Sequence, residues 1–124
     1  MKVLMIEPGK APYTKEINPG LESLQHEVGG DIEPFYPSET DAAAYIMNDE
    51  GKVIGLPLNR GLFDEGAMYD IISGPFLVVG TEESTFGSLS DELILKYTEL
   101  FRYPEVFVRL NGQIQCIRLK NDEV

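Results

Sequence analysis

The sequence predicts an α+β fold: a single two-layer domain in which two helices pack on a mainly antiparallel sheet of six to eight short strands. Short β-rich runs recur along the chain, each bounded by Gly, Pro, Asn or Asp. Two longer segments carry apolar residues at helical spacing. With 124 residues, 43% of them hydrophobic, the chain is long enough to bury a core. We expect one domain over residues 1–120 and a frayed tail over residues 121–124.

Three strands are predicted in the first third of the chain. They are the β-rich runs at residues 2–6, 13–17 and 32–36. The first ends at Glu7-Pro8-Gly9, which breaks regular structure. The third contains Pro34 and is followed by Pro37, and because proline has no N–H to donate, we expect this strand at an edge of the sheet.

The first helix is predicted between Asn18-Pro19 and Gly29-Gly30. Asn is a good cap for the free N–H groups, Pro suits the first helical position, and Gly can adopt the left-handed conformation that ends a helix. Three apolar residues share one face: Leu21, Leu24 and Val28. The only histidine, His26, falls on the opposite side and should face solvent.

The central stretch, residues 42–62, predicts a hairpin. Residues 44–47 are apolar on both faces, which is typical of a covered strand, and residues 48–51 (Asn-Asp-Glu-Gly) supply turn chemistry. The return strand is expected over Lys52 to Leu56. Pro57 should end that ladder, so that the chain leaves the sheet at residues 58–61.

Further elements follow in the second half. Residues 64–66 predict a turn, and residues 69–72 resume an extended pattern. Residues 76–79 are continuously apolar, which predicts a central strand buried on both faces. The second helix is expected from Ser88 to Arg102, with Ser88 or Ser90 as its cap.

The C-terminal segment, residues 106–119, gives the strongest local signal. Two β-rich runs flank Asn111-Gly112, the pair typical of a two-residue hairpin turn. That turn would place Phe107 opposite Cys116 and Glu105 opposite Arg118.

Charge and composition limit the partners. The net charge is −11, from 21 acidic and 10 basic residues spread evenly along the chain. Direct nucleic-acid binding depends on clustered Lys and Arg, so we expect none. No apolar run is long enough to span a membrane, and the first residues do not form a signal peptide. We therefore expect a cytoplasmic protein.

The residues needed for most catalytic chemistry are sparse. One His and one Cys, far apart in the sequence, argue against a nucleophilic triad and against a zinc site. The glycine-rich dinucleotide motif and the calcium-loop spacing are absent. We predict no catalytic residues, no metal and no cofactor.

The candidate ligand- or partner-binding residues are Asn59, Arg60, Tyr69 and Asp70. The Arg60 guanidinium is a planar fork that suits a carboxylate or phosphate, and it lies where we expect the chain to leave the sheet. Tyr69 and Asp70 arrive next and could line the same surface. In the alternative interpretation, Arg60 pairs with a nearby acid and Asn59 closes a turn.

Three classes of function remain. The first is a non-enzymatic accessory or regulatory module that binds another protein. The second is a small-molecule binder or enzyme that uses Asn59 and Arg60 on an anionic ligand, which requires a concave pocket. The third is an acidic mimic of DNA that inhibits a DNA-binding enzyme, which requires carboxylates aligned in a stripe.

Several strings in the chain are similar to a known family. They are MKVLMIEPGK, LESLQHEVGGDIE, NDEGKVIGLPLNR and YDIISGPFLVVG. Through them, and more loosely through the C-terminal hairpin, the chain resembles the domain-of-unknown-function family 3846, short proteins of Gram-positive gut bacteria, their phages and conjugative elements. The resemblance implies a bacterial or mobile-element origin. It carries over no activity and no catalytic residues.

Overall fold

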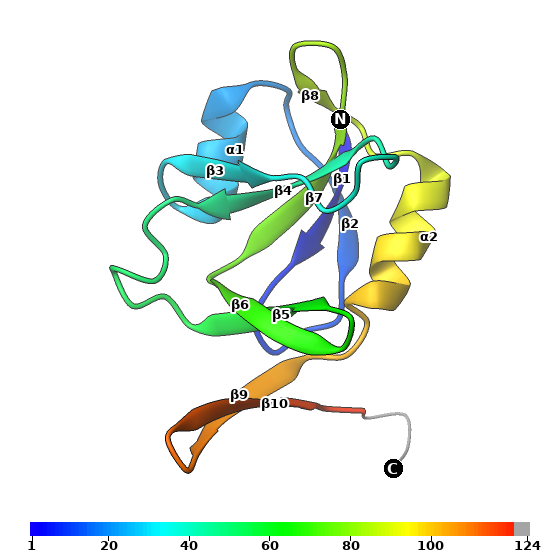
Figure 1. Ribbon diagram of the computed structural model, residues 1–124. Coiled ribbons are helices and arrows are strands. Elements are labelled where there is room, and N and C mark those ends of the chain that lie inside the picture. The colour runs from blue at the N-terminus through cyan, green and yellow to red at the C-terminus, as the bar shows by residue number, and fades with distance from the viewer. Residues whose placement is uncertain (121–124) are drawn as a thin grey trace.

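A six-stranded antiparallel sheet forms the centre of the protein in the computed structural model, which describes residues 1–120 (Figure 1). Five strands follow the order β2-β1-β7-β4-β3, and the short β8 pairs with β7. Their bounds are β1 Lys2–Ile6, β2 Tyr13–Glu16, β3 Ile32–Phe35, β4 Ala43–Asn48, β7 Phe76–Thr81 and β8 Phe86–Gly87. The central position of β7 and the edge position of β3 confirm two predictions. The predicted tail, residues 121–124, lies outside the described residues.

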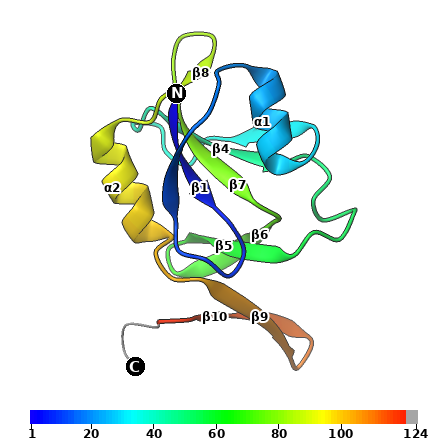
Figure 2. The ribbon, with the colours of Figure 1, turned by 180° about the vertical axis from the view of Figure 1, so that it is seen from behind.

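Both faces of the central sheet are covered. Alternate residues of β1, β4 and β7 point to opposite sides because the side-chain period of a strand is two. One side packs against Leu24 and Val28 of helix α1 (Leu21–Val28). The other packs against Tyr97 of helix α2 (Asp91–Leu100) and the neighbouring Phe101. The two helices lie on opposite sides of the sheet (Figures 1 and 2), so the expected two layers become three.

Two hairpins lie outside the central sheet. The first joins β5 (Leu58–Asp64) to β6 (Ala67–Ser73), and the second joins β9 (Glu105–Leu110) to β10 (Gln113–Arg118). All pairings are antiparallel. The α+β class with a mainly antiparallel sheet is therefore confirmed, with ten strands within residues 1–120 where six to eight were expected.

The expected return strand over Lys52 to Leu56 is wrong. β4 is already paired with β3 on one side and β7 on the other, so no edge is left for a further strand. The segment forms a series of turns, in which the Leu56 N–H donates to the Gly51 carbonyl oxygen at 2.9 Å. Residues 58–61, expected to leave the sheet, instead begin β5, which pairs with β6.

The start of α2, the end of α1 and the β9–β10 turn follow local chemistry, whereas the start of α1 does not. Ser90 caps α2 by accepting from the Leu93 N–H, and Gly29 ends α1 in the left-handed conformation, as expected. The expected cap Asn18 is wrong: the Ile17 N–H bonds the Met1 carbonyl oxygen, so strand-like pairing continues there and the helix begins after Gly20. Asn111 and Gly112 have positive φ, as the predicted hairpin turn requires.

The register of the C-terminal hairpin is the predicted one. Phe107 lies opposite Cys116, and Glu105 lies opposite Arg118. The Arg118 Nε atom is 3.3 Å from the Glu105 carboxylate. A two-residue turn fixes which residues face one another, so this part of the structure could be derived from two adjacent residues.

Candidate functional site

Asn59 lies at the start of β5 and is completely buried. Its side-chain amide donates to the carbonyl oxygens of Ile6 and Gly74, at 3.0 and 2.9 Å. Ile6 ends β1 and Gly74 follows β6, so the amide joins the central sheet to the β5–β6 hairpin. Its amide nitrogen therefore stabilises the fold.

Arg60 is also completely buried. Its guanidinium has five N–H donors, and five hydrogen bonds are present. Two go to the Phe101 carbonyl oxygen, at 3.2 and 2.9 Å, two to the carbonyl oxygens of Glu7 and Lys10, at 3.5 and 2.6 Å, and one to the Asn59 side-chain oxygen, at 2.8 Å. The positive charge thus caps the end of α2, where carbonyl groups lack helical partners.

The charge of Arg60 is held without a direct carboxylate partner among the described residues. Burial lowers the pKa of the guanidinium, and the Glu105 carboxylate opposes this shift. Arginine still keeps its proton, so the site contains a buried cation solvated by carbonyl dipoles. An anionic ligand could reach Arg60 only by displacing these carbonyl oxygens. Its proposed role as an anion anchor stays a prediction.

Tyr69 and Asp70 lie on β6 and differ from the first pair in exposure. The Tyr69 side chain is 57% exposed. The Asp70 carboxylate forms an ion pair with Lys52 and accepts from the Ile71 N–H. Burial raises the pKa of Asp70, but the bonds from Lys52 and Ile71 outweigh it and hold the pKa below its usual value. Leu62 faces Asp70 and Phe63 faces Met68, so Tyr69 is the extra residue of a β-bulge and simple alternation does not apply to it. Tyr69 and Asp70 both line a pocket of about 370 Å³, together with Lys52 and Leu58.

Tyr69 belongs to a pocket of about 250 Å³ on the α2 side of the protein. The pocket lies between β3, β4, the β5–β6 hairpin, α2 and the base of the β9–β10 hairpin. Six of its lining residues are aromatic: Phe35, Tyr45, Phe63, Tyr69, Tyr97 and Phe101. We call this cavity the aromatic pocket.

The wall of the aromatic pocket is rigid because its rings pack on one another. The Tyr45 ring lies 5.7 Å from Phe35 in a stacked arrangement, and 5.8 and 5.4 Å from Tyr97 and Phe101 in edge-to-face arrangements. Such pairs add about 0.5–1.5 kcal/mol each beyond the apolar area they bury. A ligand would therefore meet a preformed surface.

Most polar groups around the aromatic pocket are already paired. The Tyr97 hydroxyl and Lys96 both donate to the Asp41 carboxylate, at 2.8 and 2.6 Å. Arg118 pairs with Glu105 and lies over the Phe63 ring. The two cations and two anions balance, so the pocket has no net charge of its own.

Glu105 is the second buried ionisable residue of this region, with 7% of its surface exposed. One carboxylate oxygen accepts from the Gly61 N–H at 2.8 Å and from the Cys116 thiol at 3.3 Å. Burial and the bond to Glu105 raise the pKa of Cys116 to about 12. The thiol is therefore protonated at neutral pH and unsuited to act as a nucleophile.

The β9–β10 hairpin has an outer face that no described element covers. Glu105, Phe107 and Cys116 point toward the body of the protein. The opposite face carries Val106, Val108, Leu110 and Ile117, with Gln113 and Gln115. Val106, Leu110 and Ile117 are 40%, 57% and 47% exposed. In both views the hairpin lies beyond β5–β6 at one end of the molecule (Figures 1 and 2). We call the outer face, formed by Val106, Val108, Leu110, Gln113, Gln115 and Ile117, the ribbon face.

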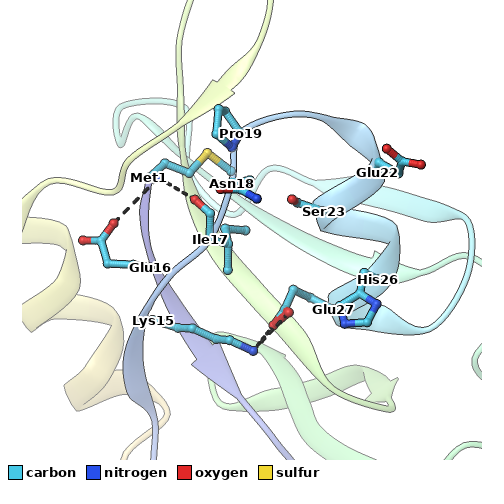
Figure 3. A pocket seen from close by; sticks show the side chains of 10 residues that line it. All are labelled: Met1, Lys15, Glu16, Ile17, Asn18, Pro19, Glu22, Ser23, His26 and Glu27. Carbon is cyan, nitrogen blue, oxygen red and sulfur yellow. Dashed lines mark hydrogen bonds and ion pairs between the residues drawn. The ribbon is translucent and has the colours of Figure 1, made fainter.

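A wide groove lies between β2 and α1 on the far side of the sheet (Figure 3). Lys15 crosses it to form an ion pair with Glu27, and the Met1 nitrogen bonds the Ile17 carbonyl oxygen at 2.6 Å. His26 lines it and is exposed, as predicted. None of its labelled side chains forms an arrangement typical of acid–base catalysis.

Within residues 1–120, no three or more His, Cys, Asp or Glu side chains are placed to hold a metal ion. No helix in the same part of the chain is long and apolar enough to cross a membrane.

Sequence reasoning missed the aromatic pocket and the ribbon face. The pocket is built from several segments far apart in the chain, so no local pattern could reveal it. The ribbon face did leave a signal, because Val106, Val108 and Leu110 alternate along one strand and Ile117 lies opposite Val106. That signal does not show which face the body covers.

Comparison with known proteins gives one match. The family model described as "Domain of unknown function (DUF3846)" matches residues 1–102 of the 124. No curated protein and no solved structure matches the chain. The match ends before β9 begins at Glu105, so the C-terminal hairpin lies outside the matched residues. The matched part is more than four-fifths of the sequence, and the chain therefore belongs to the DUF3846 family.

Proposed function

We propose that this protein is a non-enzymatic accessory module that binds another protein through the ribbon face. The observation that carries this proposal is the set of apolar side chains exposed on the ribbon face, while Glu105, Phe107 and Cys116 on the other side pack toward the body. Exposed apolar surface gathered on one face is a common feature of protein contact sites. We further propose that the protein acts in the cytoplasm of a bacterial or mobile-element host.

The charge of the hairpin supports a particular kind of partner. Residues 105–120 contain three basic residues, Arg109, Arg118 and Lys120, and one acid, Glu105. Residues 1–102 contain seven basic and eighteen acidic residues. The hairpin is thus a locally cationic part of an acidic protein. It fits a partner that presents an apolar patch rimmed by carboxylates.

The hairpin geometry favours binding over catalysis. A two-stranded ribbon offers a flat surface and two strand edges, which suit packing or strand addition against another chain. The ribbon face carries only Val, Leu, Ile and Gln side chains, none of which transfers protons or acts as a nucleophile.

The test is affinity capture with matched variants. Val106 and Ile117 are cross-strand neighbours, so replacing both with Lys disrupts the apolar end of the ribbon face at the base of the hairpin. The control replaces Val53 and Ile54 with Lys, since these are also a Val and an Ile, are even more exposed, and lie on the turns after β4. We expect a captured protein to be lost with Val106→Lys/Ile117→Lys and retained with the control.

Reconstitution with the purified partner completes the test. Binding should weaken as salt is raised, because the hairpin's basic side chains contribute. Equal capture by both double variants would contradict the proposal.

Sedimentation of the protein alone provides a further check. A dimer abolished by Val106→Lys/Ile117→Lys would show that the ribbon face binds a second copy, which would also overturn the proposal of a different partner.

A further inference from the structure

The aromatic pocket is lined by a tyrosine, Tyr45, whose hydroxyl forms no hydrogen bond with a described residue. Tyr45 is 2% exposed and lines the pocket. The neighbouring Tyr97 hydroxyl donates to Asp41, but no hydrogen bond joins the Tyr45 hydroxyl to a described residue. The Tyr45 oxygen is not completely enclosed, because the one fully buried side-chain oxygen or nitrogen without a partner among the described residues is Ser73 Oγ. Water can therefore reach the Tyr45 hydroxyl from the pocket, and a ligand that enters the pocket can replace that water.

The Tyr45 hydroxyl is suited to donate a hydrogen bond. Burial raises its pKa far above the usual range, and the neighbouring Tyr97, Tyr69 and Asp41 act in the same direction. The group therefore keeps its proton at every physiological pH. A ligand that places an acceptor, such as a carbonyl oxygen, near this hydroxyl would complete its hydrogen bonding.

Size and shape restrict the ligand further. The pocket volume is about 250 Å³. A dry protein cavity of about 150 Å³ holds benzene, so this pocket has room for one six-membered ring with a small substituent. Tyr45, Tyr97 and Phe101 present ring faces and edges against which a planar ring can stack or pack edge-on.

The charges at the pocket favour a neutral ligand. Lys96 is paired with Asp41, and Arg118 with Glu105, so each cation is balanced by an adjacent carboxylate. An anionic ligand would have to compete with these carboxylates. A neutral ring with one acceptor would leave both ion pairs in place.

We propose that the aromatic pocket binds a neutral single-ring aromatic compound whose carbonyl oxygen accepts a hydrogen bond from Tyr45. The site is separate from the ribbon face, and this inference does not depend on the proposed protein partner. Arg60 lies directly behind the pocket, since it follows Asn59 and precedes Gly61, a lining residue. Its bond to the Phe101 carbonyl oxygen makes it a positioning residue for the pocket wall.

The test uses three probes in a titration of the isotope-labelled full chain, followed by amide NMR shifts. Acetophenone has a ring and a carbonyl, ethylbenzene lacks the acceptor, and benzoate carries a charge. We expect acetophenone to shift the amides of Gly61, Leu62 and Phe101 with millimolar affinity, as is typical of such small ligands. Ethylbenzene and benzoate should bind more weakly.

Two variants assign the interaction. Tyr45→Phe removes the hydroxyl and keeps the ring, so acetophenone should bind about fivefold more weakly while ethylbenzene is unaffected. Tyr69→Ala removes an exposed ring of the wall and should weaken both probes. The controls are Tyr36→Phe and Tyr36→Ala, because Tyr36 is 60% exposed and does not line the pocket. A thermal melt of each variant checks the fold.

Three results would overturn the proposal. They are the absence of acetophenone shifts at the pocket amides, equal acetophenone affinity in Tyr45→Phe and wild type, and tighter binding of benzoate than of acetophenone. Because Tyr69→Ala changes only an exposed side chain, the test stays decisive even if Tyr45→Phe fails to fold: unchanged acetophenone binding in that variant would also overturn the proposal.

Discussion

The two hairpins outside the central sheet have the same antiparallel pairing but opposite burial. β5–β6 buries Asn59, Arg60, Leu62 and Ile72 against the body. β9–β10 buries Glu105 and leaves its outer apolar side chains exposed. The difference shows that residue type alone does not predict which side chains of these hairpins are accessible. The polar pair that suggested a ligand site supports the fold, while plain Val, Leu and Ile residues form the accessible surface.

The largest expected effect concerns the inner side of the β9–β10 hairpin. With its pKa raised to about 12, Cys116 should be alkylated by iodoacetamide in the folded protein on the order of 10³-fold more slowly than in urea-unfolded protein, because only the thiolate reacts. The rate is measured by mass spectrometry near neutral pH. Glu105→Gln removes the neighbouring carboxylate and should speed the reaction. Equal rates in folded and unfolded protein would show that the inner side is not shielded.

Arg60→Ala tests the inner side of β5–β6. It removes five hydrogen bonds and leaves the Phe101, Glu7 and Lys10 carbonyl oxygens without this donor. We expect the free energy of unfolding to fall by about 3–5 kcal/mol in urea denaturation. Arg60→Lys keeps the charge but not the fork, so its loss should be intermediate.

The matched control for Arg60 lies on the other hairpin. Arg109 is exposed and makes a single long bond to the Gly112 carbonyl oxygen, at 3.4 Å. Arg109→Ala should change the free energy of unfolding by less than about 0.5 kcal/mol. Similar losses for Arg60→Ala and Arg109→Ala would refute the structural role assigned to Arg60.

An isoleucine in each hairpin gives a direct comparison of apolar burial. Ile72 of β6 is 3% exposed, whereas Ile117 of β10 is 47% exposed. Ile72→Ala should cost about 2–5 kcal/mol, and Ile117→Ala less than about 1 kcal/mol, because only the first leaves a cavity. Chemical denaturation of the two variants measures both. A large loss in Ile117→Ala would mean that the ribbon face is covered within the protein.

The smallest expected effect concerns the pH dependence of the free energy of unfolding, to which the Asp41 carboxylate contributes through its bonds to Lys96 and Tyr97 of α2. Hydrogen bonds from Lys96 and Tyr97 lower the pKa of Asp41. A lowered pKa stabilises the fold above the ordinary carboxyl range, and this stabilisation is lost as the pH falls through the folded-state value. Asp41→Asn should therefore destabilise the protein at neutral pH and have little effect at low pH. Asp91→Asn is the control, since Asp91 is 93% exposed. If Asp41→Asn lowers the free energy of unfolding equally at neutral and at low pH, the bonds from Lys96 and Tyr97 do not stabilise the charged carboxylate.

Sequence reasoning succeeded where structure depends on adjacent residues. Asn111-Gly112 determined the pairing of Phe107 with Cys116, and Ser90 marked the start of α2. The run at residues 76–79 identified the central strand β7 because burial on both faces leaves a continuous apolar pattern.

It failed where the outcome depends on distant partners. The segment after β4 could not pair with that strand because β3 and β7 occupy both of its edges. Arg60 is buried because carbonyl oxygens 41, 50 and 53 residues away converge on it. An arginine expected at the end of a strand can bind an anion at the surface or donate to carbonyl oxygens in the interior. Only the tertiary fold distinguishes these two roles.

The Gly61 amide is the point where the family-matched body and the C-terminal hairpin depend on each other. The acceptor of this buried N–H is Glu105, three residues beyond the end of the family match. A chain shortened to residues 1–102 would expose Gly61 and the base of the aromatic pocket to water. Without the hairpin, water would have to replace Glu105 as the acceptor of the Gly61 N–H.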